Sequence, residues 1–170
     1  LADDDEVVSV KLTDGSQQLI IVTAFGQAIR FPESQVRPMG RNARGVKGIT
    51  LEADDYVVSM DVVAESADLL VVTENGYGKR TAIKEYRITN RGGKGIKTLN
   101  RTEKTGNIIS AKIVHANNEI MLISLEGIMI RMSVADISQT GRSTQGVILM
   151  KLQNNDKVVA AAQIVGKEDE

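Results

Sequence analysis

Three copies of one pattern, spaced about 50 residues apart, constrain the fold of this chain more than any other feature of its sequence. In each copy an apolar, β-branched run leads into a glycine, at Gly26, Gly76 and Gly127. A basic residue lies four positions after each of them, and a second glycine recurs further along. These matched residues are Arg30, Arg80 and Arg131, and Gly45, Gly95 and Gly146. A fixed period of this length is typical of repeat proteins, in which each unit buries its apolar face against the next.

Each copy is predicted to be a group of short strands. Short β-branched runs alternate with glycine and polar turns, and no long segment shows the 3.6-residue period of a helix. We expect the strands of the middle copy near residues 68–73, 78–83, 95–99 and 108–114. The runs Leu69–Val72 and Ile120–Ile123 are apolar at every position, as expected for strands buried on both faces between neighbouring sheets. Four strands within about 50 residues are typical of one blade of a β-propeller.

The repeats predict one partial domain over residues 1–170, because a chain of this length has room for a single core. The expected parts are the last strand of a preceding blade at 1–12, blades at 13–63, 64–114 and 115–166, and the start of an acidic tail at 167–170. The first part is inferred from Val7 and Val8, which match the apolar pair that closes each later copy. The predicted fold is therefore all-β and propeller-like, with three four-stranded antiparallel blades, one leading strand and 13 strands in total.

The distribution of charge along the chain points to an anionic partner, although the formal net charge is only −1. Both ends are acidic, since residues 1–6 hold four acidic side chains and residues 167–170 hold three. Residues 79–104, in contrast, hold nine basic and two acidic side chains. A run of charge is usually a solvated face, but a basic surface that recurs in successive repeats attracts phosphate groups.

Cations recur at matched positions in the first two copies. The matched pairs, 50 residues apart, are Arg41 with Arg91, Arg44 with Lys94 and Lys47 with Lys97. The third copy keeps the first cation as Arg142 but has Gln145 in place of the second. On adjacent blades these cations are expected to form one basic stripe along a curved edge. Gly92 and Gly93 beside them expose backbone N–H groups that also bind oxygen anions, in addition to allowing a tight bend.

We predict phosphate contacts at basic residues of all three copies and at two glycines of the middle copy. The candidate residues are Arg30, Arg37, Arg41, Arg44, Lys47, Lys79, Arg80, Arg87, Arg91, Gly92, Gly93, Lys94, Lys97, Arg101, Arg131 and Arg142. The chain has only two phenylalanines, three tyrosines and no tryptophan, which disfavours the stacking of single-stranded bases on aromatic side chains. For a nucleic-acid partner, a duplex therefore fits better than a single strand.

No catalytic, cofactor-binding or metal-binding residue is predicted in this chain. Cysteine is absent, the one histidine, His115, lies in a strand-like run, and the glycine spacing near residues 92–98 does not match a phosphate-binding loop. Tyr56, Tyr77 and Tyr86 fall within the repeat pattern and are interpreted as ordinary blade residues, not nucleophiles. Without a long apolar run or a basic signal segment, we expect a cytoplasmic, nucleoid-associated protein that contacts no membrane.

Residues 75–81, Asn-Gly-Tyr-Gly-Lys-Arg-Thr, and residues 90–98 resemble blades of the C-terminal domain of the A subunit of bacterial DNA gyrase. The resemblance covers nearly the whole chain. It implies a β-pinwheel, a propeller variant whose blades exchange a strand with a neighbour and which wraps duplex DNA around its rim. It also implies an A2B2 enzyme with an ATPase B subunit, in which residues outside this chain use ATP and magnesium to introduce negative supercoils.

Two alternatives stay open at this point. Gyrase carries a glutamine-led, arginine- and glycine-rich box of seven residues in one blade, and residues 90–95 are only its nearest relative here, so the A subunit of topoisomerase IV is an alternative parent. The alternative function is a propeller that binds an acidic protein through the same rim and does not bind DNA.

Overall fold

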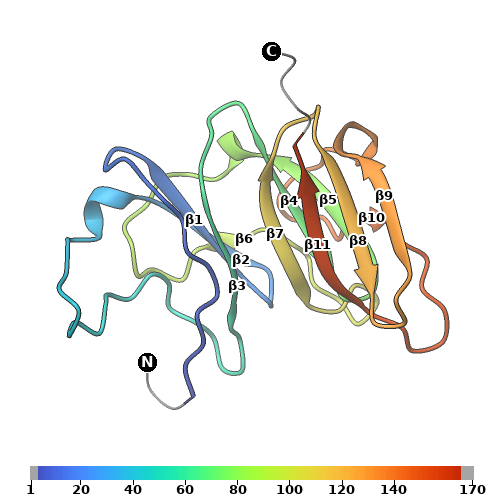
Figure 1. Ribbon diagram of the computed structural model, residues 1–170, viewed down its shortest axis with the longest axis horizontal. Helices are drawn as coiled ribbons and strands as arrows, with labels where there is room; N and C mark the ends of the chain where they lie inside the picture. Colours follow the sequence, from blue (N-terminus) through green and yellow to red (C-terminus); the bar gives the residue numbers. More distant parts are fainter. Residues whose placement is uncertain (1–3, 166–170) are drawn as a thin grey trace.

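The computed structural model describes residues 4–165, which form eleven β-strands and three short 3-10 helices (Figure 1). In chain order the elements are β1 (Gln18–Thr23), β2 (Gln27–Pro32), η1 (Glu33–Gln35), β3 (Val57–Val62), β4 (Asp68–Thr73), β5 (Tyr77–Ala82), η2 (Ile83–Glu85), β6 (Ile96–Lys97), β7 (Ile108–Val114), β8 (Glu119–Ser124), β9 (Met129–Ser133), η3 (Val134–Asp136), β10 (Val147–Ile148) and β11 (Val158–Ile164). A hairpin, a 3-10 helix, a long loop and a further strand recur in this order three times. None of the helices within residues 4–165 has the length and apolar character needed to span a bilayer.

The strands form three antiparallel sheets, one for each copy of the repeat. The first blade has the strand order β3-β1-β2-β6, the second has β7-β4-β5-β10 and the third has β11-β8-β9. In the first two blades the outermost strand comes from the following copy: β6 pairs with β2, and β10 pairs with β5. The expectation of an all-β pinwheel whose blades exchange a strand is confirmed.

The structure differs from the prediction of 13 strands in two places. Within residues 4–165 the third blade has three strands, because these residues hold no further copy that donates a strand to β9. Of the expected leading strand, the described residues 4–12 join no sheet. This segment instead lies beside β3, where Ser9 Oγ donates to the carbonyl oxygen of Met60 at 3.1 Å and Lys11 forms an ion pair with Asp61.

The core lies in layers between successive sheets, and β4 of the middle blade contributes to two of them. Leu69 and Val71 pack with residues of the first blade, whereas Leu70 and Val72 pack with residues of the third. All four side chains are buried, which confirms the prediction that this strand is covered on both faces. Burial of each such side chain stabilises the fold by about 1.5–3 kcal/mol.

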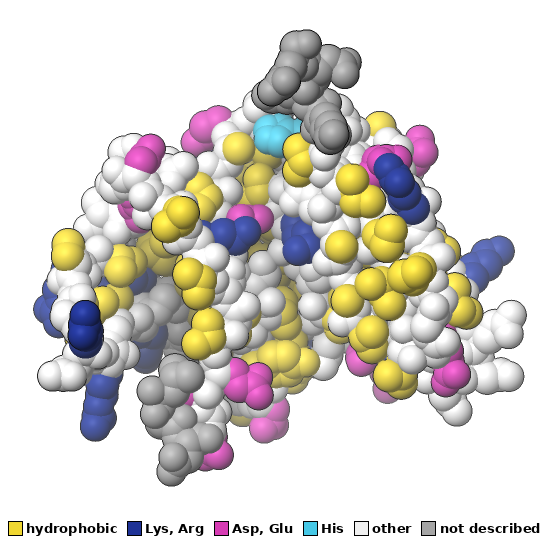
Figure 2. Space-filling model, in the orientation of Figure 1, with side chains coloured by type: hydrophobic (Ala, Val, Ile, Leu, Met, Phe, Trp, Pro, Cys, Tyr) yellow, Lys and Arg dark blue, Asp and Glu magenta, His cyan; other side chains and the backbone are white. Residues whose placement is uncertain are grey.

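The described residues cover only one face of the third blade. Ile120 and Leu122 of β8 are buried against the second blade, while Met121 and Ile123 on the other face are half-buried. Figure 2 shows apolar side chains gathered over this outer face of the third blade. The prediction that the run Ile120–Ile123 is buried on both faces is therefore wrong for the described part of the chain.

Candidate nucleic-acid interface

Three matched loops carry most of the predicted basic residues and both predicted glycines, and each loop follows a 3-10 helix. We call them the first loop (residues 36–48), the second loop (residues 86–98) and the third loop (residues 137–149). The second and third loops cross to the preceding blade, where each provides the outermost strand. Gly95 has a φ of +75°, and a Cβ atom there would lie 2.4 Å from the carbonyl oxygen of Ala28. Only glycine allows this approach of two backbones, so the recurring glycine is required by the strand exchange.

Arg91 joins the second loop to the first blade. Its backbone N–H donates to Gln35 Oε1 at 2.7 Å, its Nε donates to the carbonyl oxygen of Gln35 at 3.2 Å, and its Nη1 donates to the carbonyl oxygen of Lys47. Next to it, the N–H of Gly92 donates to the carbonyl oxygen of Gly48 at 2.7 Å. The amide predicted to bind phosphate at Gly92 is therefore already occupied.

Arg142 repeats this arrangement between the second and third copies. Its backbone N–H donates to Glu85 Oε2 at 3.3 Å, and its Nη1 donates to the carbonyl oxygen of Lys97 at 3.0 Å. Gln35 and Glu85 are 50 residues apart, as are Lys47 and Lys97, so the two junctions are built alike.

Three of the predicted DNA contacts, Arg30, Lys79 and Arg80, bond to acceptors within the protein. Arg30 is 4% exposed and Lys79 is 0% exposed. The guanidinium of Arg30 donates to two carbonyl oxygens of the next copy and pairs with Glu65 at 2.5 Å. Arg80 pairs with Asp68 at 2.8 Å and donates to a carbonyl oxygen of the third loop. Their charged groups are therefore bonded to acceptors of the protein itself.

Arg131 occupies the matching position in the third copy but is exposed. It forms an ion pair with Glu119, and the hydrogen bond to this carboxylate raises the pKa of Arg131 above its ordinary value. Within residues 4–165 no following loop is available to accept from its guanidinium, as the second and third loops accept from Arg30 and Arg80. The adjacent carboxylate weakens its attraction for phosphate.

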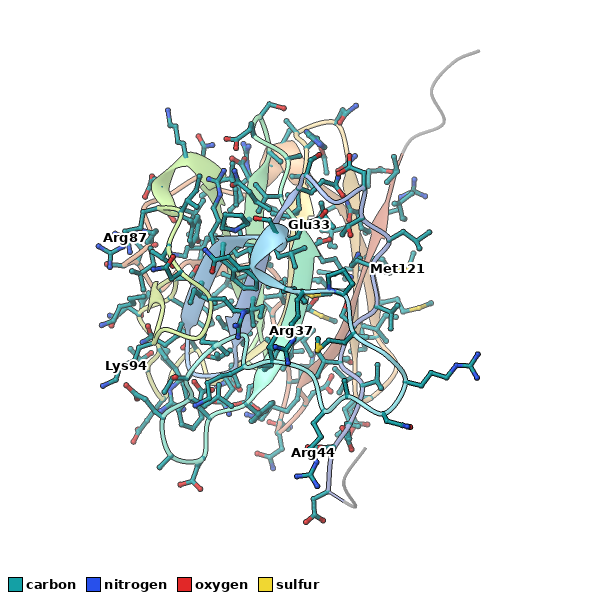
Figure 3. All side chains as sticks on the ribbon, turned by 90° about the vertical axis from the view of Figure 1, so that its left-hand side faces the viewer. Glu33, Arg37, Arg44, Arg87, Lys94 and Met121 are labelled. Atoms are coloured by element: carbon teal, nitrogen blue, oxygen red, sulfur yellow. The ribbon has the colours of Figure 1, made fainter. Side chains whose placement is uncertain are left out.

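The remaining predicted cations are exposed. They are Arg37, Arg41, Arg44 and Lys47 of the first copy, and Arg87, Lys94, Lys97 and Arg101 of the second. In Figure 3, Arg87 and Lys94 lie along one edge of the molecule, whereas Arg37 and Arg44 lie away from it. The matched residues Arg44 and Lys94 are thus not brought together, because the first loop has no preceding blade among the described residues on which to rest.

A cavity of about 290 Å³ lies between β2 and the second loop, and its rim is basic. Arg87, Lys94 and the exposed Gly93 line it, with Ile29 on the apolar side. The side chains of Arg87 and Lys94 make no hydrogen bond or ion pair with residues 4–165, nor does the N–H of Gly93. Two free cations and one free amide therefore face the space in which an anionic oxygen fits.

Arg101 extends the exposed basic surface with a more fixed geometry. Its Nη1 donates to Asn107 Oδ1 at 2.7 Å, and its guanidinium carbon lies 3.8 Å from the centroid of the Phe25 ring. A guanidinium stacked on an aromatic ring keeps its charge while losing conformational freedom.

These repeats match a known family over most of their length. A family model described as the DNA gyrase C-terminal domain, β-propeller, matches residues 17–64, 67–115 and 118–164. The chain belongs to this family.

Relatives of this gyrase C-terminal domain include two DNA gyrase A subunits. That of Halalkalibacterium halodurans is 59% identical over 170 residues, and that of Clostridium acetobutylicum is 52% identical over 169 residues, so the alignments cover 100% and 99% of the chain. The chain spans only 20% of the length of each relative. The resemblance to gyrase seen in the sequence is confirmed.

Two solved structures share the architecture of this gyrase C-terminal domain. The C-terminal domain of DNA topoisomerase IV superposes with a TM-score of 0.91, and the DNA gyrase A C-terminal domain superposes with a TM-score of 0.89. Each is 29% identical to the chain and matches 96% of it, while the chain covers 51% and 56% of those two structures.

The tyrosines of this gyrase C-terminal domain lie in ordinary blade positions. Tyr86 is buried, its hydroxyl lies 2.5 Å from Thr98 Oγ1, and burial raises its pKa to about 12. Such a hydroxyl is a poor nucleophile at neutral pH. Among residues 4–165 no group of three or more His, Asp or Glu side chains is arranged to hold a metal ion.

The sequence did not indicate which residues accept hydrogen bonds from the cations at the blade junctions. Gln35 and Glu85 accept from the backbone of Arg91 and Arg142, and Thr144 accepts from Lys79. The spacing of 50 residues between Gln35 and Glu85 was a usable signal, because both follow the same hairpin at the same distance. The carbonyl oxygens that complete each junction have no signature in the sequence.

Proposed function

We propose that this domain binds duplex DNA along the edge that carries Arg87, Lys94 and Lys97, with little dependence on base sequence. The observation that carries the proposal is the pair of free cations, Arg87 and Lys94, at the rim of the cavity between the second loop and β2. Cations of this kind contact the phosphate backbone, which is the same for every sequence. Membership of the gyrase C-terminal family supports a DNA partner.

We further propose that the duplex curves around the blades. Bending about 20–30 base pairs smoothly by about 40–90° costs on the order of 1–6 kcal/mol, which a few phosphate contacts offset. The second loop, which carries the proposed contacts, rests on the first blade, so these contacts lie where two blades meet. A relative of the chain is a DNA gyrase A subunit. We propose that in the parent enzyme the wrap supports ATP-dependent negative supercoiling, together with an ATPase B subunit in an A2B2 assembly.

In this proposal the domain itself catalyses no reaction. Cleavage and religation, and the use of ATP and magnesium, belong to parts of a type II topoisomerase outside this chain. Such an enzyme works on the chromosome, so a cytoplasmic, nucleoid-associated location is part of the proposal.

The experiment is a salt titration of duplex binding, followed by fluorescence anisotropy with a labelled duplex of about 30 base pairs. The double variant Lys94→Gln with Lys97→Gln is compared with the double variant Lys104→Gln with Lys151→Gln, which has the same net charge and alters exposed lysines elsewhere. Each lost phosphate contact reduces the magnitude of the slope of log K against log salt by about 0.9. The slope of the first variant is therefore expected to be about 2 smaller in magnitude than that of the parent, and the slope of the second variant almost unchanged. Equal losses in the two variants refute the assigned edge.

Wrapping is tested separately from binding. Fluorescent labels at the two ends of a duplex of about 40 base pairs are expected to approach each other on binding, and resonance energy transfer reports the change. Binding without any change in transfer refutes wrapping. A parent protein that binds no duplex at low salt refutes DNA binding and favours the alternative of a protein-binding propeller.

A further inference from the structure

We infer that Arg91 and Arg142 are positioning residues, which fasten each loop to the blade before it, and that they do not contact phosphate. The inference rests on the proposed function in one respect, since Lys97, whose backbone Arg142 holds, is one of the proposed DNA contacts. Both arginines belong to the set predicted from sequence to bind DNA, and the geometry points to a different use of their charge.

The donors of Arg91 are directed into the protein. Three of them, the backbone N–H, Nε and Nη1, are bonded to oxygens of Gln35 and Lys47. The residue is only partly exposed, in contrast to the exposed Lys94. A guanidinium has five N–H groups in a rigid plane, so directing two of them at neighbouring carbonyl oxygens fixes the orientation of the whole group.

Two of the three bonds are made again one repeat later, which makes chance an insufficient explanation. Arg142 uses its backbone N–H on Glu85 and its Nη1 on the carbonyl oxygen of Lys97. In both junctions the acceptors belong to the last residue of the preceding 3-10 helix and to the matched lysine of the preceding loop.

The consequence is a fixed backbone under the exposed lysines. The carbonyl oxygens of Lys47 and Lys97 are held by the arginines, while both side chains remain exposed. Around Arg91 a short ladder forms, because the N–H of Thr50 donates to the carbonyl oxygen of Gly93 at 2.8 Å and the N–H of Gly92 donates to Gly48. Holding the backbone in advance reduces the conformational entropy that these lysines lose on binding a duplex.

The first copy supplies an internal control for this inference. Arg41 matches Arg91 and Arg142 in the repeat, but its side chain makes no hydrogen bond or ion pair with residues 4–165. Substitution of arginine by lysine keeps the charge and removes the planar fork. Arg91→Lys is therefore expected to break a junction, whereas Arg41→Lys breaks nothing in this chain.

The first test is amide hydrogen exchange without DNA. We expect the amides of Gly92 and Thr50 to exchange at least tenfold faster in Arg91→Lys than in the parent, with the core strand β4 unchanged and with no effect of Arg41→Lys. Arg142→Lys is expected to speed exchange at Asn100, whose N–H donates to the carbonyl oxygen of Thr144 at 3.0 Å. Unchanged protection of these amides in both variants overturns the inference.

The second test is duplex binding by the same charge-preserving variants. If Arg142 positions Lys97, Arg142→Lys lowers the affinity several-fold although no charge is lost, and Arg41→Lys leaves it at the parental value. If Arg142 contacts phosphate directly, lysine replaces it with little loss, and the inference is overturned. Failure of the parent to bind any duplex removes the proposed function, while the exchange experiment still decides whether the arginines hold the junctions.

Discussion

The buried lysine Lys79 is expected to make the stability of this domain depend on pH. Its Nζ donates to the carbonyl oxygens of Gly141 and Arg142, each at 2.7 Å, and to Thr144 Oγ1 at 3.1 Å. Burial lowers the pKa of Lys79 from its ordinary 10.5 to about 8, against an opposite effect of the Glu85 carboxylate.

The first copy shows how the same place is filled without a charge. Ile29 matches Lys79 in the repeat, is 2% exposed and lies beneath the second loop, next to Gly93. The substitution to test is therefore Lys79→Ile, which transfers the side chain of one junction to the other.

The sign and size of the effect follow from proton linkage. The pKa of Lys79 in the folded state lies below its value in the unfolded chain, so between the two values the unfolded chain binds more protons and the free energy of unfolding rises with pH. With a pKa of about 8 in the folded state and 10.5 in the unfolded chain, the rise between about pH 7 and pH 9.5 is about 2 kcal/mol. Tyr86, whose pKa is raised to about 12, lowers stability only above about pH 10, outside this window.

The assay is urea denaturation followed by far-ultraviolet circular dichroism at four pH values across that window. The parent is expected to gain about 2 kcal/mol, and Lys79→Ile, which has nothing to titrate at this position, is expected to lack that gain. Taking the difference between the two proteins removes the contribution of the other titrating groups. Parallel curves of unfolding free energy against pH for parent and variant refute the reasoning. They would show that the three acceptors stabilise the charged ammonium of Lys79 as well as water does.

Two further predictions concern the packing of the blades, and thermal or urea unfolding checks both. Gly95→Ala is expected to lower the free energy of unfolding by well over about 1 kcal/mol, because it combines a positive φ with a clash at the carbonyl oxygen of Ala28. Gly45 has a φ of +83° with open space around it, so Gly45→Ala is expected to cost only about 1 kcal/mol. Equal losses in the two variants contradict the clash. Leu70→Ala, in the strand covered on both faces, is expected to cost about 2–5 kcal/mol, and Met121→Ala on the open face of the third blade less than about 1 kcal/mol; a larger loss at Met121 would indicate that something covers that face.

The strands that carry the core could be predicted from the sequence, because their apolar pattern is long enough to read. β4 and β7 begin and end where the middle copy predicted, at 68–73 and 108–114. The short strand β6 was expected over 95–99 and is only two residues long. It is defined by its contact with β2 of another blade and not by its own apolar residues, so periodicity does not determine its ends.

The candidate site could be predicted only in part, because sequence shows that a residue is charged and not where its charge is used. Lys79 and Lys94 are both lysines in a basic stretch, yet one is 0% exposed and the other is free at the rim of the cavity. What separates them is a set of backbone carbonyl oxygens that stand close to Lys79 after folding. Every residue has such an oxygen, so the sequence does not single out the few that are positioned to accept.

The repeat nevertheless distinguishes the arginines that join the blades from the exposed cations, because only the arginines are retained in every copy. Two arginine positions are retained in all three copies, namely Arg30, Arg80 and Arg131 at the first and Arg41, Arg91 and Arg142 at the second. In the two junctions that the structure describes, arginines from both positions donate to carbonyl oxygens across blades. At the positions of the exposed Arg87 and Lys94, the third copy has Ser138 and Gln145 instead. A junction presents the same acceptors in the same geometry each time, so it needs the same planar donor each time. A phosphate accepts from a cation of any length on any loop, so the residues that meet it are free to vary between blades.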